Sequence, residues 1–235
     1  MTPFIAEVVG TALLITFGNG VVANVVLSKT KGNGGGLIAI TFGWAMAVFI
    51  GVYAASGISG AHLNPAVTIG LAIIGKFEWA LVPSYIVAQL LGSFIGSLMV
   101  WMVYRAHFDN TADVEAKLNS FATSPSIRNT IQNFTTELLA TAIFMLAILF
   151  IAKPANTLGA VDALPVALVV LAIGLSLGGP TGYAINPARD LGPRIMHAIL
   201  PIKNKGKSDW GYAWVPVLGP ICGAILGAVI YNLLV

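Results

Sequence analysis

Six long apolar segments alternate with shorter polar ones along the 235 residues. Several of them approach the roughly 20 residues that a helix needs to cross about 30 Å of hydrocarbon. The pattern therefore predicts an all-α membrane protein with six transmembrane helices and with both chain ends on one side of the bilayer. The predicted spans cover residues 4–27, 37–55, 79–104, 135–151, 164–177 and 212–234.

Two further apolar segments, 64–75 and 186–200, are too short to cross. Each begins with Asn-Pro-Ala, in which Asn is a favoured N-cap and Pro is favoured at the first helical position. They therefore predict two half-helices. The stretches before them, 56–60 and 178–182, are rich in Gly, Ser, Thr and Pro. They indicate non-helical backbone at membrane depth, which is tolerated only where protein buries it or where it lines a watery cavity.

The two halves of the chain repeat one another. Residues 7–11 (EVVGT) are echoed by 137–141 (ELLAT), and 59–66 (SGAHLNPA) by 181–188 (TGYAINPA). Each repeat holds three spans, an odd number, so the second is inverted and the two half-helices enter from opposite faces. We expect a single transmembrane channel domain over 1–235, with repeat one at about 1–104, a connecting surface loop at about 105–133 and repeat two at about 134–235.

Composition supports the membrane class and narrows the partners. Hydrophobic residues make up 57% of the chain and charged residues only 9%, which is too few charges for a water-soluble surface. Cys222 is the only cysteine, so neither an intrachain disulfide nor a cysteine-based metal site is available. The net charge of +3 is small, and its lysines lie between spans without interleaved aromatic residues. We expect no nucleic-acid partner, no metal and no cofactor.

The half-helix starts carry the chemistry. Each helix N-terminus bears about half a positive charge, so two of them meeting near the midplane repel cations. The side-chain amides of Asn64 and Asn186 would offer N–H donors to a water or alcohol oxygen, while protons and cations meet a positive potential. A single Asn-Pro-Ala is most simply a turn or a helix start. Two copies in matching context favour a selective pore.

These motifs resemble those of the major intrinsic proteins, the family of aquaporins and glycerol facilitators. The likeness rests on residues 59–68 (SGAHLNPAVT) and 186–189 (NPAR) and covers nearly the whole chain. It implies an aquaporin-like fold and a homotetramer in the lipid bilayer, with one pore per subunit and the termini in the cytoplasm. The short termini favour a bacterial plasma membrane. The pore motifs are then Asn64, Pro65, Ala66, Asn186, Pro187 and Ala188.

The same resemblance places a selectivity filter at Trp44, Gly174, Tyr183 and Arg189. Trp and Gly at the first two positions are similar to glycerol facilitators, whereas water-selective relatives have Phe and His there. An aromatic corner with Arg189 opposite would suit a solute that is half carbon chain and half hydroxyl. Tyr183 departs from the more usual Phe, and its hydroxyl would add polarity and bulk, which keeps water, dihydroxyacetone and undissociated lactic acid open as permeants.

Other polar residues near the motifs have two interpretations each. Glu7 and Glu137 are intramembrane carboxylates, which often mark proton relays. Their repeat-related positions are better suited to accepting backbone N–H groups of the re-entrant loops, as their counterparts do in the family. His62 is either a lumen residue or a packed, hydrogen-bonded histidine. Asp190 resembles the glycerol-conducting branch, but an acid in a first helical turn is also favoured by the helix dipole.

The predicted function is a passive channel for glycerol and other small uncharged solutes, with a mainly water-selective channel as the nearest alternative. A proton-coupled secondary transporter would share inverted repeats but would need paired titratable groups at a central site. Residues 174–178 (GLSLG) match a hydrolase Gly-x-Ser-x-Gly pattern, but in an apolar span they are better explained as a close-packing Gly-x-x-x-Gly. We therefore expect no catalytic residues and no enzyme.

The loop charges conflict with cytoplasmic termini. That orientation leaves Lys76 and Lys153 inside, against the positive-inside rule. The cations that it places outside are Lys29, Lys31, Arg105, Lys117, Arg128, Lys203, Lys205 and Lys207.

Overall fold

The computed structural model describes residues 1–151 and 156–235 and contains only helices and connecting segments there. Lys153, one of the two lysines expected inside, lies outside the described residues. Six helical segments in this part of the chain are long and apolar enough to cross a membrane. The prediction of an all-α membrane protein with six spans is confirmed. The elements are α1 (Pro3–Val26), α2 (Gly36–Ser59), α3 (Pro65–Ile73), η1 (Trp79–Leu81), α4 (Val82–Asn110), α5 (Val114–Asn119), α6 (Thr130–Phe150), η2 (Gly159–Ala163), α7 (Leu164–Leu177), α8 (Pro187–Ile199) and α9 (Val215–Leu234).

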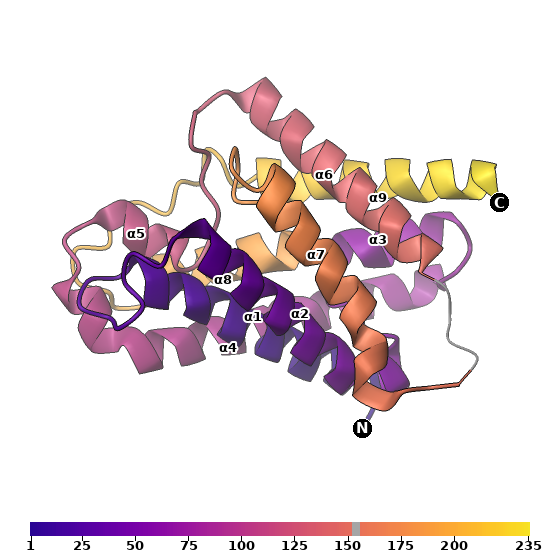
Figure 1. Ribbon diagram of the computed structural model, residues 1–235, viewed down its shortest axis with the longest axis horizontal. Coiled ribbons are helices and arrows are strands. Elements are labelled where there is room, and N and C mark those ends of the chain that lie inside the picture. Colours follow the sequence, from indigo (N-terminus) through magenta and orange to yellow (C-terminus); the bar gives the residue numbers. More distant parts are fainter. Residues whose placement is uncertain (152–155) are drawn as a thin grey trace.

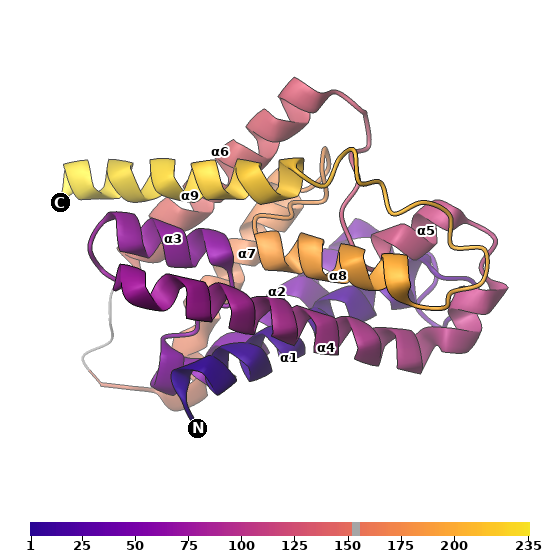
Figure 2. The ribbon, with the colours of Figure 1, turned by 180° about the vertical axis from the view of Figure 1, so that it is seen from behind.

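The helices of the two halves pair in the same way. Helix α1 packs on α2 and α4, α6 packs on α9 and α7, and α2 of the first half meets α7 of the second. The short helices α3 and α8 lie between α9 and α4 (Figure 2). They are the two half-helices that the Asn-Pro-Ala motifs predict. In Figure 1, α1, α2 and α7 pass in front of them.

Glycines set the closest helix contacts in both halves. A Cβ on Gly96 of α4 would lie 2.7 Å from the backbone oxygen of Ala12 in α1. A Cβ on Gly223 of α9 would overlap the backbone oxygen of Leu138 in α6. Small residues of this kind let membrane helices approach until their backbones touch. Glycines of α4 and α9 thus allow the equivalent α1–α4 and α6–α9 contacts.

The approach to the first half-helix is shorter than the sequence predicts. Helix α2 continues through Ser59, so residues 56–59 are helical and the irregular backbone begins at Gly60. Gly60 has a φ of 82° and its N–H bonds to the Ser56 carbonyl, which is a common glycine-dependent helix end. The expectation of non-helical backbone from residue 56 was therefore wrong for 56–59 and holds only from Gly60 onward.

The segment between the repeats is not the plain surface loop that its mixed charge predicts. Helix α4 runs on to Asn110, and residues 116–118 and 120–123 are buried. Phe108 and Phe121 are both fully buried, with ring centroids 5.3 Å apart. They belong to an apolar cluster that also contains Ala23 of α1 and Met196 of α8. Burial of these aromatic rings holds the segment down on the membrane domain.

Candidate functional site

The two half-helices begin at capped asparagines. The Asn64 Oδ1 accepts a hydrogen bond from the Ala66 N–H at 2.9 Å, and Pro follows at the first helical position. The Asn186 Oδ1 accepts from the N–H groups of Ala188 at 3.0 Å and Arg189 at 3.3 Å. Both asparagines have extended backbone before a helix, as an N-cap requires. The caps fix the direction in which the two amide groups point.

The asparagines also join the two halves of the chain. The Asn64 Nδ2 donates to the Ile185 carbonyl and the Asn186 Nδ2 donates to the Leu63 carbonyl, each at 2.8 Å. This reciprocal pair brings the N-terminal ends of α3 and α8 together. An amide has two N–H donors, and the second one on each asparagine has no partner in the described residues. Both donors remain for a molecule beside the junction.

The first approach loop is held by a buried carboxylate. The Glu7 side chain is fully buried, and its Oε1 accepts from the Ser59 hydroxyl at 2.7 Å and the His62 N–H at 2.9 Å. Its Oε2 accepts from the Leu63 N–H and the Gln89 amide, both at 2.8 Å. Both oxygens are therefore occupied by fixed donors. This is the geometry of a structural acceptor, and it leaves no free oxygen for a proton relay.

The second approach loop repeats the arrangement. The fully buried Glu137 accepts from the Thr181 hydroxyl at 2.7 Å and from the N–H groups of Ala184 at 3.0 Å and Ile185 at 2.9 Å. Ile185 and Tyr183 have positive φ angles of 44° and 38°, an uncommon backbone for such residues. The carboxylate satisfies the N–H groups that this irregular backbone leaves without helical partners.

A cavity of about 480 Å³ lies beside the asparagine junction. Most of its wall is apolar, and the polar groups come from a few side chains. Such a wall suits a small molecule that has both a carbon skeleton and hydrogen-bonding groups. The apolar residues include Leu14, Val48, Val52, Val67, Leu71, Phe144, Ile148, Val166 and Val170, and the polar or aromatic ones are Trp44, His62, Asn64, Tyr183, Asn186 and Arg189.

Three of the four predicted filter residues, Trp44, Tyr183 and Arg189, line the cavity. The Arg189 guanidinium lies over the Trp44 ring, 4.2 Å from its centroid. Its Nη1 donates to the Phe121 carbonyl at 3.1 Å. Tyr183 borders the same cavity. The cavity lining thus includes two aromatic side chains and a guanidinium whose position is fixed by a cation–π contact and a hydrogen bond.

Gly174, the fourth predicted residue, is not among the residues that line the cavity. A Cβ on Gly174 would lie 2.9 Å from the Tyr183 Cζ and 3.0 Å from its hydroxyl. The Tyr183 ring therefore occupies the space that a side chain at 174 would fill. The absence of a side chain at Gly174 makes room for that ring.

The sequence leads one to expect that the Tyr183 hydroxyl adds polarity to the cavity, but the structure places this hydroxyl elsewhere. Its oxygen is buried and has no hydrogen-bond partner in the described residues. The side chain presents its ring, and the hydroxyl is sealed against α7 near Gly174. At this wall tyrosine therefore acts as phenylalanine would.

His62 both borders the cavity and is packed and hydrogen-bonded, so it fits both interpretations that the sequence allows. It borders the cavity, and its ring also packs against Phe77 and Tyr85 at centroid distances of 4.6 and 4.9 Å. Its Nδ1 lies 3.1 Å from the Thr68 hydroxyl oxygen. The histidine is a packed, hydrogen-bonded wall residue.

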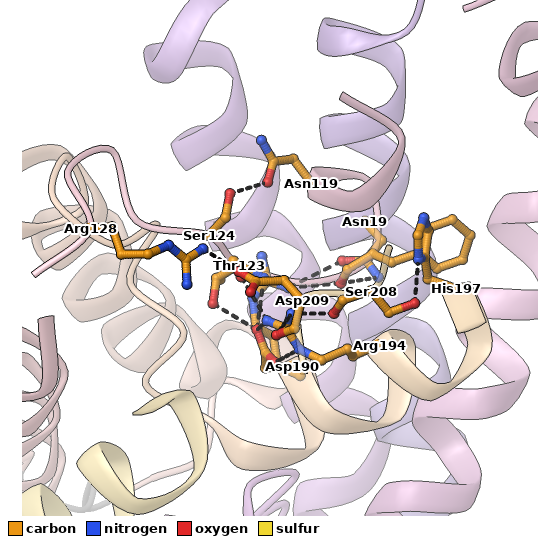
Figure 3. A network of polar contacts seen from close by, with 12 residues as sticks. Asn19, Asn119, Thr123, Ser124, Arg128, Asp190, Arg194, His197, Ser208 and Asp209 are labelled. Atoms are coloured by element: carbon orange, nitrogen blue, oxygen red, sulfur yellow. Dashed lines mark hydrogen bonds and ion pairs between the residues drawn. The ribbon is translucent and has the colours of Figure 1, made fainter. Parts of the chain in front are cut away.

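Asp190 lies away from the cavity in a buried ion pair (Figure 3). Its Oδ1 accepts from the Arg194 Nε at 2.8 Å, and its Oδ2 accepts from the Thr123 N–H and hydroxyl, both at 2.7 Å. Arg194 also donates to the Thr123 carbonyl at 2.7 Å and the Ser208 carbonyl at 2.8 Å. The pair ties the 116–123 segment and the α8–α9 connection to α8.

The sequence motifs do not point to Arg194, Thr123 or Phe121, which hold Asp190 and Arg189 in place. Arg194 carries a usable signal, because it stands four residues after Asp190 and opposite charges at that spacing meet on a helix. Phe121 contributes a backbone carbonyl, which leaves no mark in the sequence.

In the part of the chain that the structure describes, six membrane-length helices and two half-helices with a mixed apolar and polar cavity beside their junction define a polytopic membrane protein. The model of the major intrinsic protein family matches residues 1–231. The chain belongs to this family.

Similar proteins and a solved structure support membership in this family. The chain is 54% identical to a probable glycerol uptake facilitator protein of Thermotoga maritima, over 99% of both chains. It is 52% identical to the glycerol uptake facilitator protein of Bacillus subtilis, over 99% of this chain and 84% of that one. The X-ray structure of the aquaglyceroporin from Plasmodium falciparum superposes with a TM-score of 0.86 and 36% identity, over 97% of this chain and 94% of that one.

Proposed function

We propose that this protein is a passive membrane channel that conducts glycerol and other small uncharged solutes and excludes protons and ions. The observation that carries the proposal is the paired amide donors of Asn64 and Asn186 beside a cavity with an aromatic wall and a guanidinium. Relatives named as glycerol uptake facilitators support glycerol as the solute. The family is one of channels, and the chain is not an enzyme.

We assign the selectivity filter to Trp44, Tyr183 and Arg189, with Gly174 behind Tyr183. The aromatic rings would hold the carbon chain of a polyol while Arg189 donates to its hydroxyl groups. Asn64 and Asn186 would then replace water as donors at the junction. Since Arg189 and two helix N-termini bring positive charge to this path, a cation would find no compensating anion.

Water would follow the same path, and so would dihydroxyacetone and undissociated lactic acid, which are small and uncharged like glycerol. A mainly water-selective channel is the weaker candidate, because Gly174 lets the Tyr183 ring stand back from the cavity. A proton-coupled transporter is weaker still, because the carboxylates of Glu7 and Glu137 are engaged by fixed donors.

We propose a homotetramer in a bacterial plasma membrane with cytoplasmic termini, and two repeats joined at about 105–133. Two of the cations that oppose this orientation have partners within the folded chain, Lys117 in a buried place and Arg128 at the surface. The Lys117 Nζ donates to the Lys203 and Asn204 carbonyls, and burial lowers the pKa of Lys117. Arg128 pairs with Asp209. The positive-inside rule still counts both cations, because acidic partners contribute little to it, so the orientation rests on the resemblance to the family.

Purified protein in liposomes tests the function. We expect fast reswelling after mixing with glycerol, no reswelling with sorbitol, and no effect of a proton ionophore on either result, as followed by light scattering. Water shrinkage without glycerol entry would assign a water channel instead. Glycerol entry that depends on a proton gradient would contradict a passive channel.

A further inference from the structure

Asn19 is a buried amide in the second half of α1. Its side chain is fully buried. A buried amide is costly unless it is hydrogen-bonded, and here both ends have partners. The Nδ2 donates to the Phe121 carbonyl at 3.1 Å, and the Oδ1 lies 3.5 Å from the Arg189 Nη1. Figure 3 shows Asn19 beside the polar network that surrounds Asp190.

The three groups form a closed triangle. The Arg189 Nη1 donates to the same Phe121 carbonyl that Asn19 holds, also at 3.1 Å. The direct Asn19 to Arg189 distance is long for a hydrogen bond. The amide therefore acts chiefly by orienting the shared carbonyl and by placing its own oxygen dipole toward the guanidinium. A bond to a charged group is stronger than a neutral one, so the orientation of this carbonyl affects where Arg189 sits.

The neighbouring residue on α1 touches the other side of the same wall. A Cβ on Gly18 would overlap the six-membered ring of Trp44. Trp44 in turn stacks under the Arg189 guanidinium at 4.2 Å. Two consecutive residues of α1, Gly18 and Asn19, thus support the aromatic and the cationic parts of the wall.

We propose that Asn19 is a positioning residue for the selectivity of this channel. It fixes the Arg189 guanidinium against Trp44 without neutralising its charge. The assignment rests on the proposed filter role of Arg189. An amide suits this place because it matches both partners, whereas a carboxylate would pair with the arginine and an apolar side chain would leave the Phe121 carbonyl to Arg189 alone.

Two substitutions and one control test the assignment in proteoliposomes. Asn19→Leu removes both contacts at similar volume, and Asn19→Asp keeps the shape but adds a negative charge. Asn24→Leu makes the same change five residues later on α1, where the side chain accepts from the Gly32 N–H and has no contact with Arg189. Glycerol, water and proton fluxes are measured on the same preparations, and the ratio of glycerol to water permeability is compared.

A purely structural role would lower all fluxes together, through fewer folded channels, and leave the ratio unchanged. We expect the ratio to fall about fivefold in Asn19→Leu, the change that losing one ordinary hydrogen bond gives in a rate. We expect Asn19→Asp to raise proton flux, because the added carboxylate offsets the Arg189 charge. Asn24→Leu keeps the wild-type values.

Unchanged ratio and proton flux in both Asn19 variants, with glycerol conduction in the wild type, would overturn the assignment alone. A wild-type protein that does not conduct glycerol would overturn the proposed function, and this assignment with it.

Discussion

Gly174→Val is expected to lower glycerol permeability more than about tenfold, because inserted methyl groups force side chains to move in a well-packed site. The first added carbon would overlap the Thr41 methyl and lie 2.9 Å from the Tyr183 ring. Thr41 is held on α2 by its hydroxyl bond to the Leu37 carbonyl at 2.7 Å. The Tyr183 ring has open space on one side, the cavity, and is displaced into it. Reswelling in glycerol per reconstituted protein measures the loss.

Two variants separate this mechanism from a general effect. Gly57→Val makes the same change on α2 at a glycine whose added Cβ would meet nothing within 4 Å, so glycerol permeability stays normal. Tyr183→Phe removes a sealed, unpaired hydroxyl. It keeps the wild-type ratio of glycerol to water permeability and raises the free energy of unfolding by about 1 kcal/mol. Normal glycerol flow in Gly174→Val would show that the ring does not set the opening.

Glu7→Leu is expected to lower the free energy of unfolding by about 3–5 kcal/mol, as for other losses of one partner in a buried charged network. The carboxylate accepts four hydrogen bonds, two of them from the backbone N–H groups of His62 and Leu63. Those two N–H groups would remain buried without partners. Denaturant titration in detergent, followed by tryptophan fluorescence, measures the loss.

Glycerol conduction should fall with it, because Leu63 supplies the carbonyl that receives the Asn186 amide. Glu78→Leu is the matched control, since Glu78 is exposed between α3 and α4. A Glu7→Leu protein as stable as Glu78→Leu would contradict the structural role of the carboxylate.

The spans could be predicted because a helix that crosses a membrane requires a long apolar segment. The half-helices could be predicted because each begins with an Asn-Pro-Ala motif. Six apolar segments and two Asn-Pro-Ala starts correspond to the elements found, and 164–177 matches α7 at both ends. The burial of segment 105–133 could not be predicted, because its mixed charge is typical of a surface loop although Phe108 and Phe121 are buried. Its position depends on a tertiary cluster, which has no local signature.

Some features of the candidate site could likewise be predicted from the sequence and others could not. Asn64, Asn186, Trp44 and Arg189 carry distinctive side chains, so motif and resemblance located them, and the cavity is lined by all four. Their roles as pore and filter stay predictions. Which way the Tyr183 hydroxyl points depends on the space at Gly174 and Gly178, which only coordinates provide.

Thiol modification of a cavity residue tests the central claim most directly. Val52 lines the cavity, and the single native cysteine, Cys222, can first be replaced by serine. We predict that a small water-soluble thiol reagent stops glycerol reswelling in Val52→Cys and that a reductant restores it. The same cysteine at Val229, an exposed residue of α9, leaves glycerol flow unchanged. Undiminished glycerol flow in a fully modified Val52→Cys protein would mean that this cavity is not the path.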